Sequence, residues 1–416
     1  MSDGDQAPAQ ARLLRERGEG ERVTFIELFF DLVYVFAVTG LSELLLHHLT
    51  VRGAAQTSLL LLAVWRAWVD TAWVTNWFDP ERPAVRLMLV GVMLASLLMS
   101  ASLPGAFGGR GLLFAGAYVA IQIGRTSFVV ATLRAEPRLR RNFDRILAWF
   151  LVSGVLWLAG GVVHGVAREA LWLAAVAVDS AAPASGFFTP SLGRSTPSDW
   201  TIAGTHLAER CQLFLIIALG ESILVIGATL VASPLSGATV AALVVAFAGS
   251  VALWWIYFDR AADVARSVIA SADDPGRLGR SAYTYSHLPM VAGIIVAAVG
   301  DELTIAHPGG HVTASAAAVV LGGPALFLAG HAMFKWTVFA HLAVPRLLAI
   351  LALGVLAPVA MVVPPLALAA MATLVLAAVA GSDTWDLRRS ERAAPAEARA
   401  ASEASDAAEV PEAPEA

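Results

Sequence analysis

The chain has 416 residues, of which 57% are hydrophobic and only 15% are charged. Soluble domains carry about 25% charged residues, so this composition excludes an ordinary soluble domain. The single cysteine, Cys211, excludes an intrachain disulfide framework. The formal net charge of -5 is dominated by the C-terminal tail, and the lack of any sizeable soluble block argues against a nucleic-acid partner.

From residue 25 onward the chain consists largely of apolar blocks close to the roughly 20 residues that a bilayer crossing requires. We therefore predict an all-α fold, a polytopic membrane helix bundle with about 12 transmembrane helices. The predicted spans are 25–49, 57–78, 84–104, 111–134, 143–164, 168–182, 207–231, 237–259, 281–300, 312–341, 345–363 and 364–382.

The segments between and beside the spans define the predicted organisation. Residues 1–24 are polar and arginine-rich without the apolar core of a signal peptide, so we expect a cytoplasmic N-terminal segment. A connecting loop rich in Pro and Gly, 183–206, separates a first membrane half, 25–182, from a second, 207–382. The tail 383–416 is rich in Ala, Pro and Glu and is predicted to be a disordered acidic cytoplasmic segment.

Arginines concentrate in alternate connecting segments if the N-terminus lies inside. Cytoplasmic loops carry the excess of Lys and Arg, so this asymmetry predicts both termini in the cytoplasm.

Short sequence matches recur six predicted spans apart. "WVTNWFDP" (73–80) resembles "WWIYFDRA" (254–261), and "GRTSF" (124–128) resembles "GHAMF" (330–334), in the same order. An even-numbered repeat inserts both halves with the same orientation, as in parallel-repeat transporters. The matches favour two parallel six-helix repeats.

Charged residues within the first predicted half suggest a polar centre. An ionised group in a span costs about 2.5–3.5 kcal/mol and is by default a functional candidate. Glu27 and Asp31 share one face of the first span, and Arg66 and Asp70 share one face of the second. We expect Asp31, Asp70 and Arg66 to meet at similar depth, with Arg125 of the fourth span beside them. A structural ion-pair network explains the same residues without any transport.

In the second half, the deepest acidic residue is Glu221, in an apolar run with no adjacent cation. A buried carboxyl that can change protonation suits a proton-coupled carrier, so Glu221 is the leading candidate. His287, near Pro289, suits a proton relay but also fits a satisfied core histidine. Lys335 and His331 lie four residues apart on the tenth span.

No nucleotide-binding P-loop, GxSxG or HExxH motif occurs in the sequence. We therefore predict no catalytic residues, no metal site and no cofactor, while a membrane enzyme stays open as an alternative.

Four segments together resemble the bacterial low temperature requirement protein A family. They are "TFIELFFDLVYVFAVTGLS", "HLAERCQLFLIIALGESIL", "WWIYFD" and "YTYSHLPMVAGI", and the resemblance runs from about Val23 to about Trp385. It implies a multi-pass protein of the bacterial cytoplasmic (inner) membrane. The family is named for growth in the cold, so the resemblance leaves the activity open. The matching motif positions are Glu27, Asp31, His206, Glu209, Arg210, Gly220, Glu221, Asp259 and His287. Cys211 stands where the family pattern favours a more polar residue.

The leading hypothesis is a secondary transporter of an unidentified small solute, with proton coupling left open and an anion favoured. Its predicted site lies between the two halves. Transport or proton-linked candidates are Glu221, Asp31, Glu27, Asp70 and His287; anion or ion-pair candidates are Arg66, Arg125, Arg210 and Lys335; motif candidates are His206, Glu209 and Asp259. The alternatives are a membrane enzyme or lipid-handling protein, and a non-catalytic sensor or scaffold. The expected partners are the lipid bilayer and the solute, and the oligomeric state stays open.

Overall fold

The computed structural model describes residues 13–15, 22–196, 202–259, 261–270, 272 and 274–385. Within these residues every regular element is helical. Most of the predicted N-terminal segment and the predicted tail beyond residue 385 lie outside the described residues.

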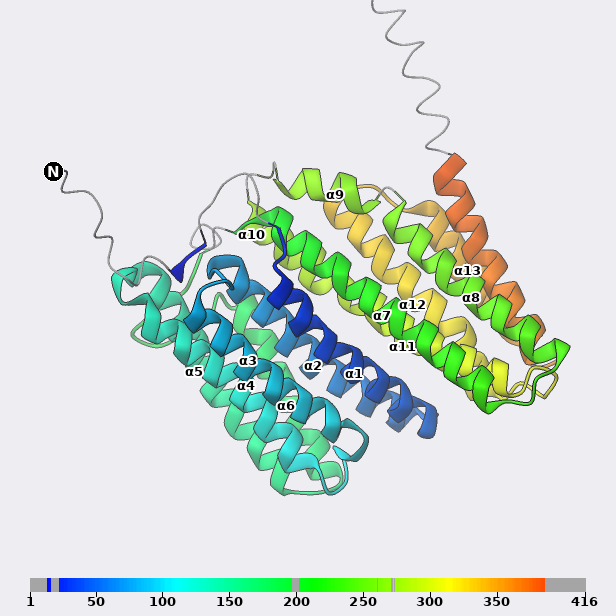
Figure 1. Ribbon diagram of the computed structural model, residues 1–416, viewed down its shortest axis with the longest axis horizontal. Helices are drawn as coiled ribbons and strands as arrows, with labels where there is room; N and C mark the ends of the chain where they lie inside the picture. The colour runs from blue at the N-terminus through cyan, green and yellow to red at the C-terminus, as the bar shows by residue number, and fades with distance from the viewer. Residues whose placement is uncertain are drawn as a thin grey trace, which may run out of the picture.

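Two groups of helices follow one another along the chain (Figure 1). The first group contains α1 (Phe25–His47), α2 (Val51–Trp77), α3 (Pro83–Ser102), α4 (Gly111–Thr132), α5 (Pro137–Val162) and α6 (Val166–Ala184). The second contains α7 (Gly204–Ala232), α8 (Gly237–Phe258), α9 (Ala261–Ala270), α10 (Pro275–Leu278), the π-helix η5 (Gly279–Tyr285), α11 (His287–Ala306), α12 (Ala314–Phe339), α13 (Val344–Val359) and a last helix, Pro365–Trp385.

Within the described residues, nine helices are long and apolar enough to cross a membrane. Each of the predicted spans falls on a helix, but α2, α6 and α13 are not among the nine. α2 carries Arg66 and Asp70, α6 carries Arg168, Glu169 and Asp179, and α13 has only 16 residues. The prediction of a membrane bundle with several crossings is therefore confirmed, but the predicted number of about 12 crossings is not.

Local sequence signals explain where several helices begin. Thr24 and Glu27 form a capping box at the start of α1, in which each side chain satisfies a free backbone N–H of the first turn. The side chains of Thr50, Ser236 and Thr313 accept hydrogen bonds from backbone N–H groups at the starts of α2, α8 and α12. These caps fix the ends of helices whose apolar composition alone leaves the boundaries open.

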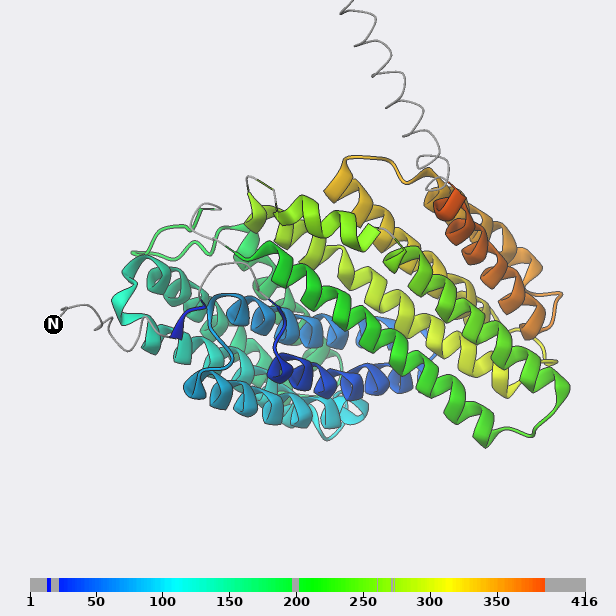
Figure 2. The ribbon, with the colours of Figure 1, turned by 45° about the horizontal axis from the view of Figure 1, so that its top comes forward.

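α1 and α7 join the two groups. Figures 1 and 2 show α1 lying between α7 and the other helices of the first group, and α1 also contacts α11. The start of α1, α9, α10 and the end of the last helix lie at the same end of the bundle (Figure 1).

Helix contacts within the two groups correspond. α1 packs on α3, α3 on α4 and α4 on α5, and likewise α7 packs on α11, α11 on α12 and α12 on α13. Small residues allow the closest of these approaches. A Cβ added at Gly323 of α12 would lie 2.4 Å from the backbone nitrogen of Ala297 on α11, as expected where membrane helices pack through small side chains.

Candidate functional site

The first polar cluster joins α1 to α7, and we call Glu27, Asp31, His206 and Arg210 the motif cluster. All four side chains are buried. Arg210 Nη2 donates to Asp31 Oδ1 at 2.6 Å, and Arg210 Nη1 lies 3.7 Å from Glu27 Oε1. His206 Nε2 lies 2.9 Å from Glu27 Oε1. Glu27 and Asp31 of α1 thus each face a basic side chain of α7.

Neighbouring groups complete the motif cluster. Trp68 of α2 donates its indole N–H to Asp31 Oδ1 at 2.8 Å. Arg15, in the segment before α1, lies 3.3 Å from Glu27 Oε2, which also accepts from the backbone and hydroxyl of Thr24. The buried charges are therefore paired between α1 and α7, with a neutral hydrogen bond from α2, and such pairing offsets the cost of burying them.

The predicted meeting of Asp31 with Asp70 and Arg66 is wrong. Trp68 and Asp70 are two positions apart on α2, so their side chains leave the helix about 200° apart. Trp68 reaches Asp31 on α1, whereas Asp70 faces α4, where Gln122 Nε2 donates to its Oδ2 at 3.0 Å. α2 thus separates two polar regions that the sequence suggested were one.

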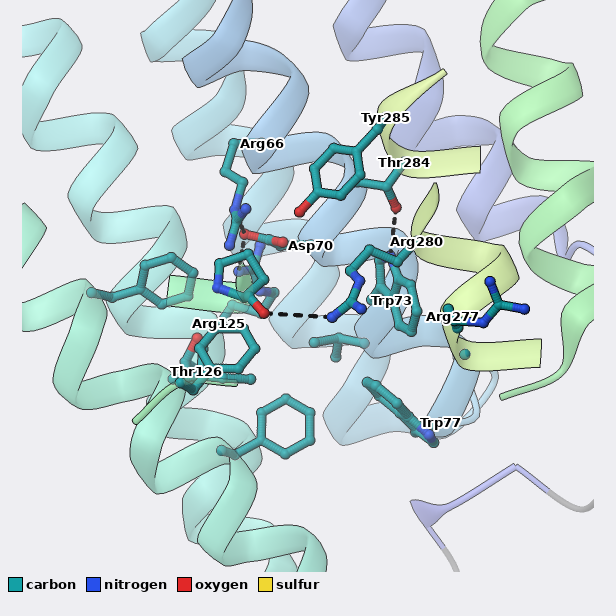
Figure 3. Close-up of a pocket in the computed structure, with 17 residues that line it drawn as sticks. Arg66, Asp70, Trp73, Trp77, Arg125, Thr126, Arg277, Arg280, Thr284 and Tyr285 are labelled. Carbon is teal, nitrogen blue, oxygen red and sulfur yellow. Dashed lines mark hydrogen bonds and ion pairs between the residues drawn. The ribbon is translucent and has the colours of Figure 1, made fainter. Parts of the chain in front are cut away.

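The second polar region contains Arg66, Asp70 and Arg125. Arg66 Nε donates to Asp70 Oδ2 at 2.8 Å, and Arg125 Nη2 lies 3.8 Å from the same oxygen (Figure 3). Arg125 also donates to Thr71 Oγ1 at 2.9 Å and to Gln122 Oε1 at 2.6 Å. The predicted grouping of Arg66, Asp70 and Arg125 is therefore observed.

These three side chains line a pocket that is open to solvent. We call it the arginine pocket. Its apolar walls come from α2, α5 and the segment that follows α6 (Figure 3). The aromatic lining residues are Trp73, Trp77, Phe143, Phe150, Phe187 and Tyr285.

Two further arginines line the same pocket, Arg277 on α10 and Arg280 on η5. Arg277 is exposed and lies 3.8 Å from Asp274. Arg280 is half-buried and has no carboxylate partner among the described residues. The lining therefore carries four guanidinium groups and one carboxylate, that of Asp70.

Sequence reasoning missed Asp179 of α6, which is buried behind the pocket lining. It accepts hydrogen bonds from Tyr118 Oη at 2.8 Å and Trp157 Nε1 at 3.1 Å, and is close enough to Arg66 to act on it electrostatically. The half-buried Arg66 and the buried Arg125 thus have two carboxylates near them, Asp70 and Asp179, and only Asp70 lines the pocket.

The π-helix η5 brings the second group of helices to the pocket. Trp65 of α2 donates to the backbone oxygen of Thr284 at 2.9 Å, and Trp73 donates to its hydroxyl at 3.1 Å. Cys211 is buried with its Sγ 3.7 Å from the backbone oxygen of Tyr283. Short π-helical segments are rare and frequently occur at functional sites, but no sequence periodicity distinguishes one from an ordinary helix start.

His287 and its neighbours form a separate group in the second half. Tyr257 Oη lies 2.7 Å from His287 Nε2, and His287 Nδ1 donates to the backbone oxygen of Ala282 at 3.0 Å. Both ring nitrogens are therefore satisfied, as in the alternative of a core histidine. Tyr283 stacks on the same ring.

The remaining candidates lie apart from both polar regions. Asp259 ends α8 and accepts a 3.5 Å hydrogen bond from Thr384. Glu209 and Lys335 are half-buried on α7 and α12 and do not line the arginine pocket.

Glu221 lies about 16 Å further along α7 than Arg210, at 1.5 Å per residue. Its side chain is buried but lines neither the motif cluster nor the arginine pocket. The predicted single centre, shared by Asp31, Arg66, Arg125 and Glu221, is therefore wrong: the charges occupy three separate regions. Within the described residues, no three or more His, Cys, Asp or Glu side chains are grouped so that they could hold a metal ion.

The fold and its polar regions define a polytopic helical membrane protein with an arginine-lined pocket, formed by helices of the first group together with α10 and η5 of the second. The family model described as bacterial low temperature requirement A protein (LtrA) matches residues 22–381. The chain belongs to this family and is a bacterial membrane protein.

A relative of similar length is the Rhizobium meliloti (strain 1021) protein whose printed name is "Uncharacterized protein RA0937". It is 39% identical over 335 residues, which cover 80% of this chain and 82% of the relative. No solved structure matches the chain.

Proposed function

We propose that this protein is a secondary transporter of the bacterial cytoplasmic membrane that carries a small anion with an apolar body. The observation that supports this proposal is the arginine pocket, in which Arg66 and Arg125 stand beside aromatic walls. Guanidinium groups are the preferred partners of carboxylate, sulfonate or phosphate oxygens. The aromatic side chains would enclose the apolar part of the same solute.

The depth of the pocket also favours a carrier. Arg66 is near the middle of α2, about 22 Å from its start and about 16 Å from its end at 1.5 Å per residue. Substrate sites of secondary transporters commonly lie near the bilayer midplane. Because Arg277 and Arg280 are nearer to the end of the bundle where α9 and α10 lie, a solute could enter from that side (Figure 1).

The corresponding helix contacts of the two groups support the predicted parallel duplication with about 12 crossings. α2, α6 and α13 would then cross the membrane shielded by their neighbours. Both described ends of the chain are on the side of α9 and α10. We propose that this side, on which the arginine-rich segments lie, faces the cytoplasm.

Isothermal titration calorimetry on the purified full chain tests the proposal. Benzenesulfonate is the probe, because it joins a permanent negative charge to an aromatic ring, and neutral benzenesulfonamide is its matched control. We expect saturable binding of the sulfonate only. Arg125→Gln should weaken binding by about tenfold or more, because a hydrogen bond to a charged group contributes about 1.5–3 kcal/mol.

Two further variants separate binding from folding. Arg280→Gln changes a half-buried side chain of the pocket without breaking a buried ion pair, and should also weaken sulfonate binding. Arg52→Gln alters an exposed arginine paired with Glu169, away from the pocket, and should leave binding unchanged. Equal binding of the neutral probe, or none of either, would contradict the proposal. Uptake of labelled benzenesulfonate into proteoliposomes then tests transport itself.

A non-catalytic sensor or scaffold is the second candidate, and the motif cluster favours it. Its charges are paired between α1 and α7, and Trp68 of α2 donates a hydrogen bond to Asp31, which suits a role in holding the two groups of helices together. In this case anion binding would occur without uptake.

A further inference from the structure

Glu221 is a buried carboxylate of α7 that forms no ion pair with any cation among the described residues. Its side chain is 1% exposed, and neither carboxylate oxygen makes a hydrogen bond within the described part of the chain. The motif cluster differs, because its carboxylates on α1 each face a basic side chain of α7, the helix that carries Glu221. A structural ion pair therefore does not account for Glu221.

The groups around Glu221 are acidic. Glu43 of α1 and Glu302 of α11 are the charged side chains close enough to act on it electrostatically, and Thr39 of α1 is the hydroxyl nearby. α1, α7 and α11 all contact one another, so these side chains meet where three helices join. α8, which also packs on α7, carries no charged side chain between Gly237 and Phe258.

Exposure increases from Glu221 towards the end of the bundle. Glu302 is half-buried, whereas Glu43 and His47 are exposed on successive turns of α1. His47 and Glu43 both act electrostatically on Glu302. Asp301, next to Glu302, is the other acidic residue of α11. Titratable groups therefore lead from the surface to the buried carboxyl.

An isolated carboxylate is costly to keep ionised away from water, so Glu221 needs a bound positive partner. The described donors are not grouped as a metal site would require. We infer that Glu221 is a reversible proton-binding site, loaded from the His47 end of the α1–α7–α11 junction through Glu43 and Glu302. A proton moves from water to the surface groups and then to a carboxylate oxygen of Glu221, and returns by the same path.

This site is independent of the arginine pocket. Glu221 and its acidic neighbours do not line that pocket. Glu221 is also further along α7 than the basic residues of the motif cluster. If the protein transports an anion, this site supplies the proton that is coupled to transport. The site lies between α1 and α7, which belong to different groups of helices, so its protonation can affect how the two groups pack.

Labelling with a hydrophobic carbodiimide tests the inference, because this reagent adds to protonated carboxyl groups in apolar surroundings. The full chain in lipid is labelled over a range of pH and its peptides are identified by mass spectrometry. We expect labelling at Glu221, increasing as the pH falls, and none at that position in Glu221→Gln. Glu169→Gln, on α6 and away from this junction, serves as the matched control and should keep the label at Glu221.

Infrared spectroscopy supplies a second readout that needs no reagent. The carbonyl band of a protonated carboxyl shifts when water is replaced by deuterium oxide, and this band should be lost in Glu221→Gln but kept in Glu221→Asp. The shift should develop severalfold more slowly in Glu302→Gln and Glu43→Gln, because they lie on the path. The inference is overturned if wild-type protein shows neither carbodiimide labelling at Glu221 nor the infrared band. Deuterium exchange that is as fast in Glu302→Gln and Glu43→Gln as in wild type would exclude the path.

Neither measurement requires a transported solute. Failure of anion binding would leave the proton site standing, and an unprotonated Glu221 would leave the arginine pocket standing.

Discussion

At the scale of single residues, buried charge is handled in two different ways along α7. Arg210 and His206 are matched to the carboxylates of α1, whereas Glu221 has no basic partner among the described residues. We propose that the matched residues hold helices together and that the unmatched residue, Glu221, changes its charge. The sequence alone does not distinguish these two kinds of charged residue, because each is simply an acidic or basic position of a motif.

Removing one member of the buried pair Asp31–Arg210 should be strongly destabilising. Arg210→Gln leaves Asp31 buried without its cation, and we expect a loss of about 3–5 kcal/mol in the free energy of unfolding. The double variant with Asp31→Asn should recover part of this loss, since no uncompensated charge remains. Thermal unfolding of the solubilised protein measures both.

The exposed pair Arg52–Glu169 provides the matched control. The side chain of Arg52 is 61% exposed, so Arg52→Gln should cost no more than about 1 kcal/mol. If Arg210→Gln were as mild as Arg52→Gln, the motif cluster would not have the structural role assigned to it.

At the scale of helices, close packing depends on which face of each helix carries small side chains. Gly323 faces α11 so closely that no Cβ fits, whereas its neighbour Gly322 has nothing within 4 Å of an added Cβ. Adjacent residues on a helix leave it about 100° apart, so only one of two identical residues lies in the interface.

Gly323→Ala should therefore destabilise the protein, because the new methyl group forces α11 and α12 apart. Overpacking of a tight contact costs about 1–3 kcal/mol. Gly322→Ala should be neutral or slightly stabilising, since alanine favours the helix over glycine. Melting temperatures in one detergent check the pair, and equal effects at both positions would contradict the observed rotation of α12.

At the scale of the whole molecule, apolar side chains cover the outside as well as the inside. Leu87 and Leu94 of α3 and Val244 and Phe247 of α8 are exposed. Exposed apolar surface of this kind suits contact with lipid. The motif cluster and Glu221 are buried on α1 and α7, and the arginine pocket is lined by residues of α2, α4, α5, α10 and η5.

The proposed topology can be checked by labelling single cysteines in a Cys211→Ala background. A membrane-impermeant maleimide should reach Arg138→Cys and Ser405→Cys from the cytoplasmic side, and Gly109→Cys from the opposite side. This follows from an even number of crossings with both termini inside. Labelling of Arg138→Cys and Ser405→Cys from different sides would rule out about 12 crossings.

The sequence by itself determined that this is a helical membrane protein, because apolar blocks of bilayer length permit little else. It also determined contacts within one helix, such as Arg66 with Asp70, since residues four apart share a face. Only the tertiary structure decided that Asp31 pairs with Arg210, that Asp70 faces Arg125, and that Arg280 reaches the same pocket from η5. In a membrane, lipid is as apolar as the protein interior, so the pattern of apolar residues does not specify how each helix is rotated or which helices become neighbours.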